Sequence, residues 1–173
     1  MLRRTFPIVI LAAMLVGLAE RAAAQPTVFI VRHAERADAA PGASAMMASD
    51  PDLSDAGRAR AAALDVMLRD VPLSAIFVTQ YKRTQQTAAP TAARQKVTAT
   101  TVPSSDTAAL VEKLKAATGN VLVVGHSNSV PDIVKALGGT AAITIADDEF
   151  DNLFIVRPGS PASVIRLHMP PVR

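Results

Sequence analysis

Apolar and polar positions alternate in blocks along the chain, and the blocks predict strands and helices in turn. Short runs of β-branched and aliphatic residues are typical of buried strands, and they occupy residues 27–31, 75–79, 96–102 and 121–124. Apolar residues at helical spacing, or stretches with helix start and stop signals, predict helices at residues 54–67, 82–94, 107–118 and 129–137. Three further strands are predicted near the C-terminus, at residues 142–145, 152–156 and 163–168. This alternation predicts right-handed βαβ units, and hence an α/β fold: a three-layer αβα sandwich with a mostly parallel central sheet.

Local signals place some of the boundaries. Ser54 is a helix N-cap candidate with Asp55 in the first turn. Pro90 must bend or end the second helix, because proline lacks the backbone N–H. Residues 38–51 are rich in Ala, Gly, Pro, Ser and Asp and predict a loop. No internal repeat or long linker divides the chain, so one domain is expected.

The N-terminal segment has a different pattern. Arg3 and Arg4 precede fourteen uncharged, mostly apolar residues at 6–19, and three alanines follow at 22–24. This arrangement predicts a secretory signal peptide over residues 1–24 and a domain over residues 25–173. The apolar run is short for a bilayer-spanning helix, although an uncleaved N-terminal anchor is the alternative. The expected location is therefore the periplasm or the exterior, with no stable membrane span after processing.

Composition narrows the function. Half of the 173 residues are hydrophobic, and none is cysteine, which excludes disulfides, a thiol nucleophile and thiolate zinc sites. Removal of residues 1–24 takes away three positive charges and one negative charge, so the formal net charge falls from +3 to about +1. No run of Lys and Arg is present, and nucleic-acid binding is not expected.

Reactive side chains follow three of the predicted strands. Arg32 and His33 end the first strand, the second leads through Thr79 to Arg83, and His126 follows the most apolar strand. Because the carboxyl ends of parallel strands meet at one edge of a sheet, these side chains are expected to share a pocket. Arginine forks match phosphate oxygens, and a neutral imidazole can attack phosphorus. The sequence therefore predicts phosphoryl transfer through a phosphohistidine.

Three motifs carry a resemblance to a known family. They read VRHAE at residues 31–35, TQYKRTQQTA at 79–88 and VGHSN at 124–128. In this order, each near the end of a strand, they resemble the histidine phosphatase superfamily in its phosphoglycerate mutase-like branch, and in particular its compact periplasmic and phosphohistidine-phosphatase-like members. The resemblance implies the fold predicted above, a phosphomonoester hydrolase, and no metal or organic cofactor.

The resemblance also implies roles for individual residues. His33 is the residue that becomes phosphorylated, Arg32 and Arg83 bind phosphate, and His126 is a second pocket histidine that hydrogen-bonds the transferred group. Ala34 stands where the family often has glycine. No family motif for the proton donor is visible. Glu35 is the favoured candidate because it is close to His33 and ionisable.

Several assignments remain open from the sequence. Asp106 is the alternative proton donor. The run GHSNS at 125–129 resembles a nucleophile elbow, so a serine esterase using Ser127, an acid within 147–151 and His168 is a rival. A module that binds a phosphorylated ligand without turnover is another. Arg36, Lys82 and the acidic residues at 147–151 are expected to be solvated, and His168 to be structural. The expected partner is a small phosphorylated substrate or a lipopolysaccharide phosphate, and the oligomeric state is not predicted.

Overall fold

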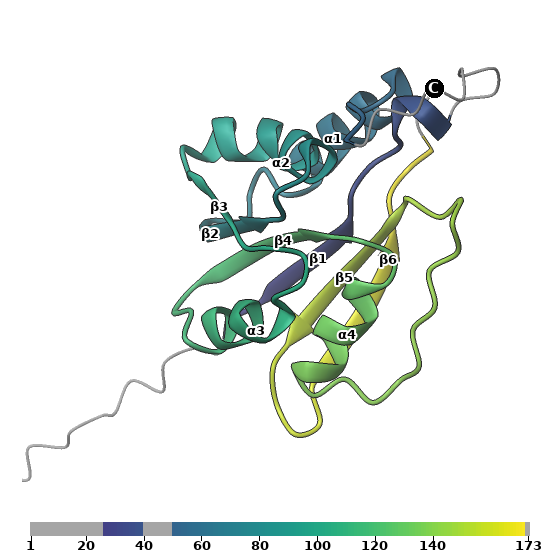
Figure 1. The fold of residues 1–173 in the computed structure, drawn as a ribbon. Coiled ribbons are helices and arrows are strands. Elements are labelled where there is room, and N and C mark those ends of the chain that lie inside the picture. The colour runs from purple at the N-terminus through teal and green to yellow at the C-terminus, as the bar shows by residue number, and fades with distance from the viewer. Residues whose placement is uncertain (1–25, 40–49, 172–173) are drawn as a thin grey trace, which may run out of the picture.

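A six-stranded sheet forms the centre of the molecule in the computed structural model, which describes residues 26–39 and 50–171 (Figure 1). The strands lie in the order β3-β2-β4-β1-β5-β6, and their bounds are β1 Val28–Arg32, β2 Leu73–Val78, β3 Ala99–Thr101, β4 Asn120–Gly125, β5 Asn152–Arg157 and β6 Ser163–His168. The first four are parallel to one another, whereas β5 is antiparallel to both β1 and β6. The sheet is thus mixed but mostly parallel.

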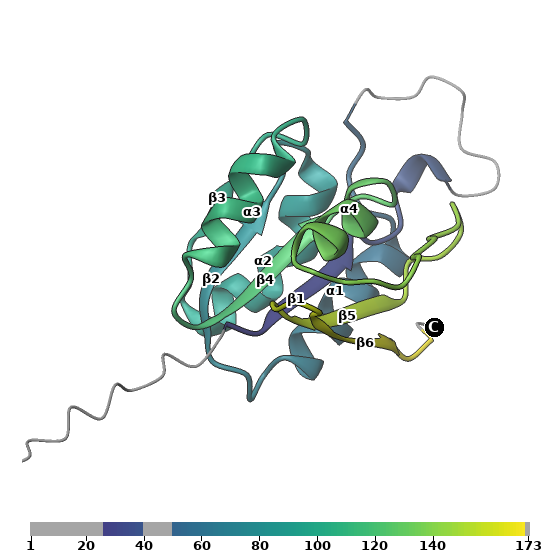
Figure 2. The same ribbon diagram turned by 90° about the horizontal axis from the view of Figure 1, so that it is seen from below.

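Helices cover both faces of this sheet, as the two views show (Figures 1 and 2). The helices are α1 Asp55–Met67, α2 Lys82–Gln95, α3 Thr107–Lys115 and α4 Ser129–Ala136, with a short 3-10 turn, η1, at Ala37–Ala39. α1 and α2 lie on one face, and α3 and α4 lie on the other. The predicted three-layer α/β architecture is confirmed.

The pleat of β1 explains why its sequence is apolar throughout. Phe29 and Val31 point into the core beneath α1 and α2, whereas Val28 and Ile30 point into the core beneath α3 and α4. A strand that is covered on both faces has no solvent side, so the alternation expected of a half-buried strand is absent.

The predicted start of the first helix at Ser54 is confirmed. Ser54 caps α1, and its hydroxyl oxygen accepts a hydrogen bond from the Gly57 N–H at 3.0 Å. Pro90 lies inside α2, which continues to Gln95. No helix of the described residues is long and apolar enough to cross a membrane. The predicted signal peptide, residues 1–24, lies outside the described ranges.

The strand predicted at residues 142–145 is wrong. Residues 142–145 pair with no strand, and both edges of β1 are taken by β4 and β5. Ile145 is nevertheless buried in the core cluster that includes Ile133 of α4. The apolar pattern there reflects packing against the core and not strand pairing.

Candidate active site

The site forms at the edge of the sheet where β1, β2 and β4 end. Arg32 is the last residue of β1 and lies opposite Gly125, the last residue of β4. The His33 N–H donates to the Gly125 carbonyl at 2.9 Å, which holds the two strand exits together. His33 and His126 therefore emerge side by side, with ring centroids 5.4 Å apart.

A cavity of about 490 Å³ opens at this edge, and we refer to it as the main cavity. Its walls are Arg32, His33, Arg36, Arg83, His126, Ser127, Asn128, Asp147 and Phe150. The four residues predicted to hold and attack phosphate from three separate strand exits are thus brought together in one cavity.

His33 is held in one tautomer by its own loop. Its Nδ1 lies 2.8 Å from the Ala34 carbonyl oxygen, which can only accept, so Nδ1 carries the proton. The lone pair is then on Nε2. The side chain is buried, and burial lowers the pKa of His33 to about 3, with nearby His126, Arg83 and Arg32 acting in the same direction. His33 is therefore a neutral imidazole with a free Nε2 near neutral pH.

The loop that carries His33 is tied to α2. The Ala34 N–H donates to the Thr87 hydroxyl at 2.9 Å, and that hydroxyl donates to the Arg83 carbonyl at 2.7 Å. This connection couples the position of the imidazole to the helix that presents the Arg83 guanidinium. A shared support of this kind keeps the reacting groups in register.

His126 is oriented by two threonine hydroxyls. The Thr84 hydroxyl donates to backbone carbonyl oxygen, closest to that of Tyr81 at 2.8 Å, so its only proton is used there. The Thr79 hydroxyl must then donate to Thr84 Oγ1 at 3.0 Å, and His126 Nε2, 3.1 Å from Thr79 Oγ1, must donate to Thr79. Burial lowers the pKa of His126 to about 4, helped by Arg83 and Arg32. His126 is thus also neutral, with its proton on Nε2.

Each of the two arginines has an aromatic platform. The Arg32 guanidinium lies 4.1 Å from the ring centroid of Phe150, and that of Arg83 lies 4.2 Å from the ring centroid of Tyr81. Arg83 also faces Asp50 at 3.8 Å. Among the described residues, the buried Nε atoms of both arginines have no hydrogen-bond partner. A buried donor without a partner is costly.

Three cavity residues were missed from the sequence. Arg36 was expected to be solvated, but it lines the main cavity while pairing with Asp38 at 3.0 Å. Asp147 and Phe150 come from the segment before β5. Their only sequence signal was an acidic cluster ahead of a strand, and nothing in it showed that this strand starts at the site. Lys82 is exposed, as expected, and is not part of the cavity wall.

The structure places Glu35 outside the main cavity, where the predicted proton donor would have to act. Arg60 of α1 grips its carboxylate with Nε, 2.9 Å from both oxygens, and with Nη2, 2.6 Å from Oε1. A Cβ at Gly57 would lie 2.1 Å from the Glu35 carbonyl oxygen, so the backbone packs tightly on α1 as well. Glu35 does not line the main cavity. It is close to His33 in sequence, but its side chain fastens the loop to α1.

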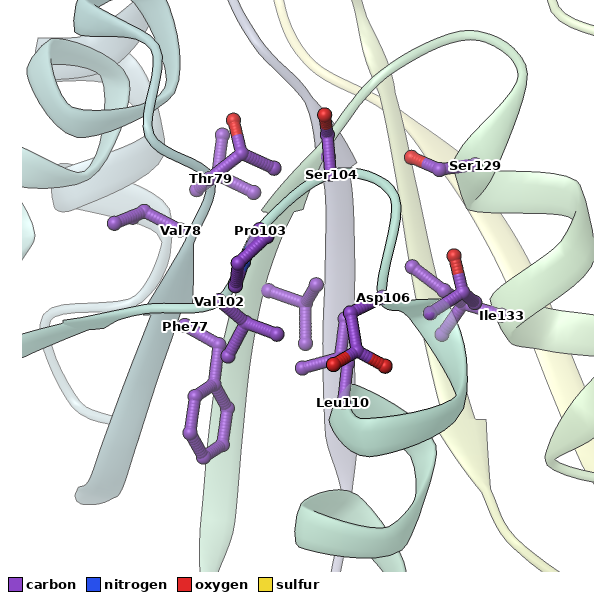
Figure 3. A pocket seen from close by; sticks show the side chains of 14 residues that line it. Phe77, Val78, Thr79, Val102, Pro103, Ser104, Asp106, Leu110, Ser129 and Ile133 are labelled. Carbon is purple, nitrogen blue, oxygen red and sulfur yellow. The ribbon is translucent and has the colours of Figure 1, made fainter.

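Asp106, the alternative donor, lies at a different cavity. It caps α3 by accepting the Ala109 N–H at 3.0 Å, and it lines a small cavity of about 20 Å³ (Figure 3). Most of that cavity's wall is apolar, including Phe77, Leu110 and Ile133. The small cavity has no room for a phosphate ester, so Asp106 is a capping residue.

The serine esterase alternative does not fit the structure. Ser127 lines the main cavity, whereas His168 pairs with Asp151 at 3.0 Å in a separate hollow beside β6. The serine and the histidine that a catalytic triad requires therefore do not meet. Within the described ranges, no group of three or more His, Asp or Glu residues is arranged to hold a metal ion.

A buried neutral imidazole between two arginines, at the carboxyl edge of a mostly parallel sheet, defines a class of enzyme that transfers phosphoryl groups through histidine. The comparison with known families agrees. Residues 28–106 match the histidine phosphatase superfamily (branch 1). The family and the enzyme class inferred from the motifs are confirmed.

Solved structures share the fold. The protein histidine phosphatase SixA, complexed with tungstate, is 20% identical with a TM-score of 0.65, over 84% of this chain and 97% of that one. The alpha-ribazole phosphatase from Shigella flexneri is 15% identical with a TM-score of 0.66, over 82% and 96%. The putative phosphohistidine phosphatase SixA from Agrobacterium tumefaciens is 20% identical with a TM-score of 0.56, over 82% and 97%. No curated protein matches the chain.

Proposed function

We propose that this chain hydrolyses phosphate monoesters through a phosphohistidine at His33. One observation carries the proposal: the bond from Nδ1 to the Ala34 carbonyl leaves Nε2 of a buried imidazole unprotonated in a cavity walled by Arg32 and Arg83. A ring that could not protonate near neutral pH, beside two cations, suits attack on a phosphate dianion.

The chemistry follows from this arrangement. The guanidinium groups of Arg32 and Arg83 hold the phosphoryl oxygens, and His33 Nε2 attacks phosphorus while the bond to the ester oxygen breaks. The alcohol leaves with that bond's electron pair and a proton from a general acid, whose conjugate base later accepts the proton that the attacking water loses. Water then attacks the phosphorus, the P–N bond breaks with its electrons returning to Nε2, and inorganic phosphate leaves.

The size of the main cavity and the predicted export narrow the choice of substrate within the family. The related structures above are described as acting on phosphorylated histidine in a protein and on a ribazole phosphate, so one fold serves different substrates. The main cavity, at about 490 Å³, suits a small ester or the phosphate group of a larger molecule. Together with the predicted export, this favours a small phosphate ester of the cell envelope or a lipopolysaccharide phosphate.

Export itself is a separate proposal, based on the basic start, the apolar run at 6–19 and the alanines at 22–24. Expression of the full chain in a bacterial host should yield a protein that lacks residues 1–24, and mass spectrometry of the periplasmic fraction measures this. Recovery of the intact chain in the membrane fraction would instead indicate an anchor.

Hydrolysis of phosphate monoesters by residues 25–173 tests the proposed activity. We expect turnover of p-nitrophenyl phosphate, phenyl phosphate and glycerol phosphate without added metal, and a radiolabelled phosphoryl group on the protein after brief reaction. The label should be stable to alkali and lost in acid, as a P–N bond is. Tight binding of inorganic phosphate without turnover of any ester would support the non-catalytic module.

A further inference from the structure

Among the residues that the structure describes, Asp147 has the only carboxylate on the wall of the main cavity. The other acids nearby do not line this cavity, and each has a partner. Glu35 pairs with Arg60, Asp38 pairs with Arg36, and Asp50 accepts the Lys82 N–H and faces Arg83 at 3.8 Å. The segment 40–49, for which the structure gives no description, contains no Asp or Glu. A proton donor in this cavity therefore has one carboxylate candidate.

Asp147 is presented by a built turn. Arg32 Nη1 donates to the carbonyl oxygens of Ala146 at 2.8 Å and of Glu149 at 3.0 Å, one on each side of Asp147. The Glu149 N–H donates to the Ala146 carbonyl at 3.0 Å, and the Glu149 carboxylate accepts the Ala146 N–H at 2.8 Å. These bonds close the turn on itself and fix it to an arginine of the site.

The same turn is fastened on its outer side. The second carboxylate oxygen of Glu149 lies 3.3 Å from Arg166 Nη2 on β6, and Phe150 stacks under the Arg32 guanidinium. Glu149 and Phe150 thus serve as supports, which leaves Asp147 as the acidic side chain of the turn that is exposed to the cavity. Burial lowers the pKa of Arg32, and the negative charges of Asp147 and Asp148 both act against that shift. A phosphate held by Arg32 would therefore lie beside the Asp147 carboxyl group.

We propose that Asp147 is the acid and base of the reaction. This inference rests on the proposed phosphatase activity. In the first step, the protonated carboxyl group gives its proton to the ester oxygen as the P–O bond breaks, so a neutral alcohol leaves. In the second step, the carboxylate takes a proton from water as the water oxygen attacks phosphorus and the P–N bond breaks. The carboxyl group ends the cycle protonated, as it began.

The dependence on the leaving group tests this role. p-Nitrophenolate leaves readily without a proton, whereas the oxygen of an alkyl phosphate does not. We expect Asp147→Asn to lower kcat/KM for glycerol phosphate on the order of 100-fold, and for p-nitrophenyl phosphate less than about threefold. This constant covers the steps up to formation of phosphohistidine, so a slow second step does not hide the effect.

Asp148→Asn is the matched control, because Asp148 is the exposed neighbour and lines the hollow beside β6 instead. It should leave both constants unchanged. Equal losses on the two esters, or none, in Asp147→Asn would overturn the proposal, because a charge that only repels or positions the phosphate affects both alike. If the wild-type chain hydrolyses neither ester, the proposed function fails and not this assignment alone.

Discussion

His33→Asn should lower the turnover of p-nitrophenyl phosphate on the order of 10⁴-fold or more, because it removes the nucleophile on which the covalent route depends. Asparagine is close to the imidazole in size, and its amide N–H can still donate to the Ala34 carbonyl that His33 Nδ1 now contacts. The fold should therefore survive while the Nε2 lone pair is lost. Initial rates and the yield of labelled phosphoprotein measure the effect, and both should fall together.

The pH dependence gives a second measure of the same residue. Since burial lowers the pKa of His33 to about 3, protonation inactivates the ring only near that pH. The population of neutral imidazole should therefore stay nearly constant between pH 8 and pH 5, where an ordinary histidine becomes mostly protonated. Titration of the ring signals by NMR tests this directly. A His33 signal that titrates near pH 6.5 would contradict the buried neutral ring.

His168→Asn controls for the loss of a histidine as such. His168 is on β6, contacts Asp151 and lies outside the main cavity, so activity and labelling should persist in this variant. Retention of labelled protein in His33→Asn would mean that another residue accepts the phosphoryl group, and the assignment of the nucleophile would be wrong.

The sequence was sufficient for the fold and for the residues that follow parallel strands. Parallel strands deliver their carboxyl ends to one edge, so Arg32, His33 and His126 could be brought together without coordinates. Arg83 could also be predicted, because α2 begins at Lys82, soon after β2 ends at Val78. The ordered motifs added the expectation that these four residues act as one set.

The residues on the other side of the cavity could not be predicted from the ends of parallel strands. Asp147 and Phe150 precede β5, whose antiparallel direction brings its start, not its end, to the site. Composition does not determine that direction, so the acidic cluster was read as a solvated loop. The sequence instead favours Glu35 as the proton donor, because it is close to His33. Its partner Arg60 comes from α1, 25 residues further along the chain, and proximity in sequence cannot reveal such a competing ion pair.

Arg83→Ala should lower kcat/KM for phosphate esters on the order of 10²- to 10³-fold, with KM raised and kcat reduced together. The guanidinium is largely buried, has an unpartnered Nε and faces the cavity that receives the phosphate. Its charge acts on the bound ester and on the charge that develops in the transition state, so both constants should respond. Steady-state kinetics measures the two constants, and inhibition by tungstate measures oxyanion binding without chemistry.

Lys82→Ala separates this effect from a general loss of positive charge on α2. Lys82 is the adjacent residue, but its ammonium group is exposed, lies 3.8 Å from Asp52 and takes no part in the cavity wall. Such exposed pairs contribute little, so Lys82→Ala should keep nearly wild-type kinetics and tungstate inhibition. Comparable losses in both variants would indicate long-range attraction of the anion, whereas a loss in Lys82→Ala alone would make Lys82 the phosphate ligand. Only a selective loss in Arg83→Ala agrees with a guanidinium that contacts the phosphoryl oxygens.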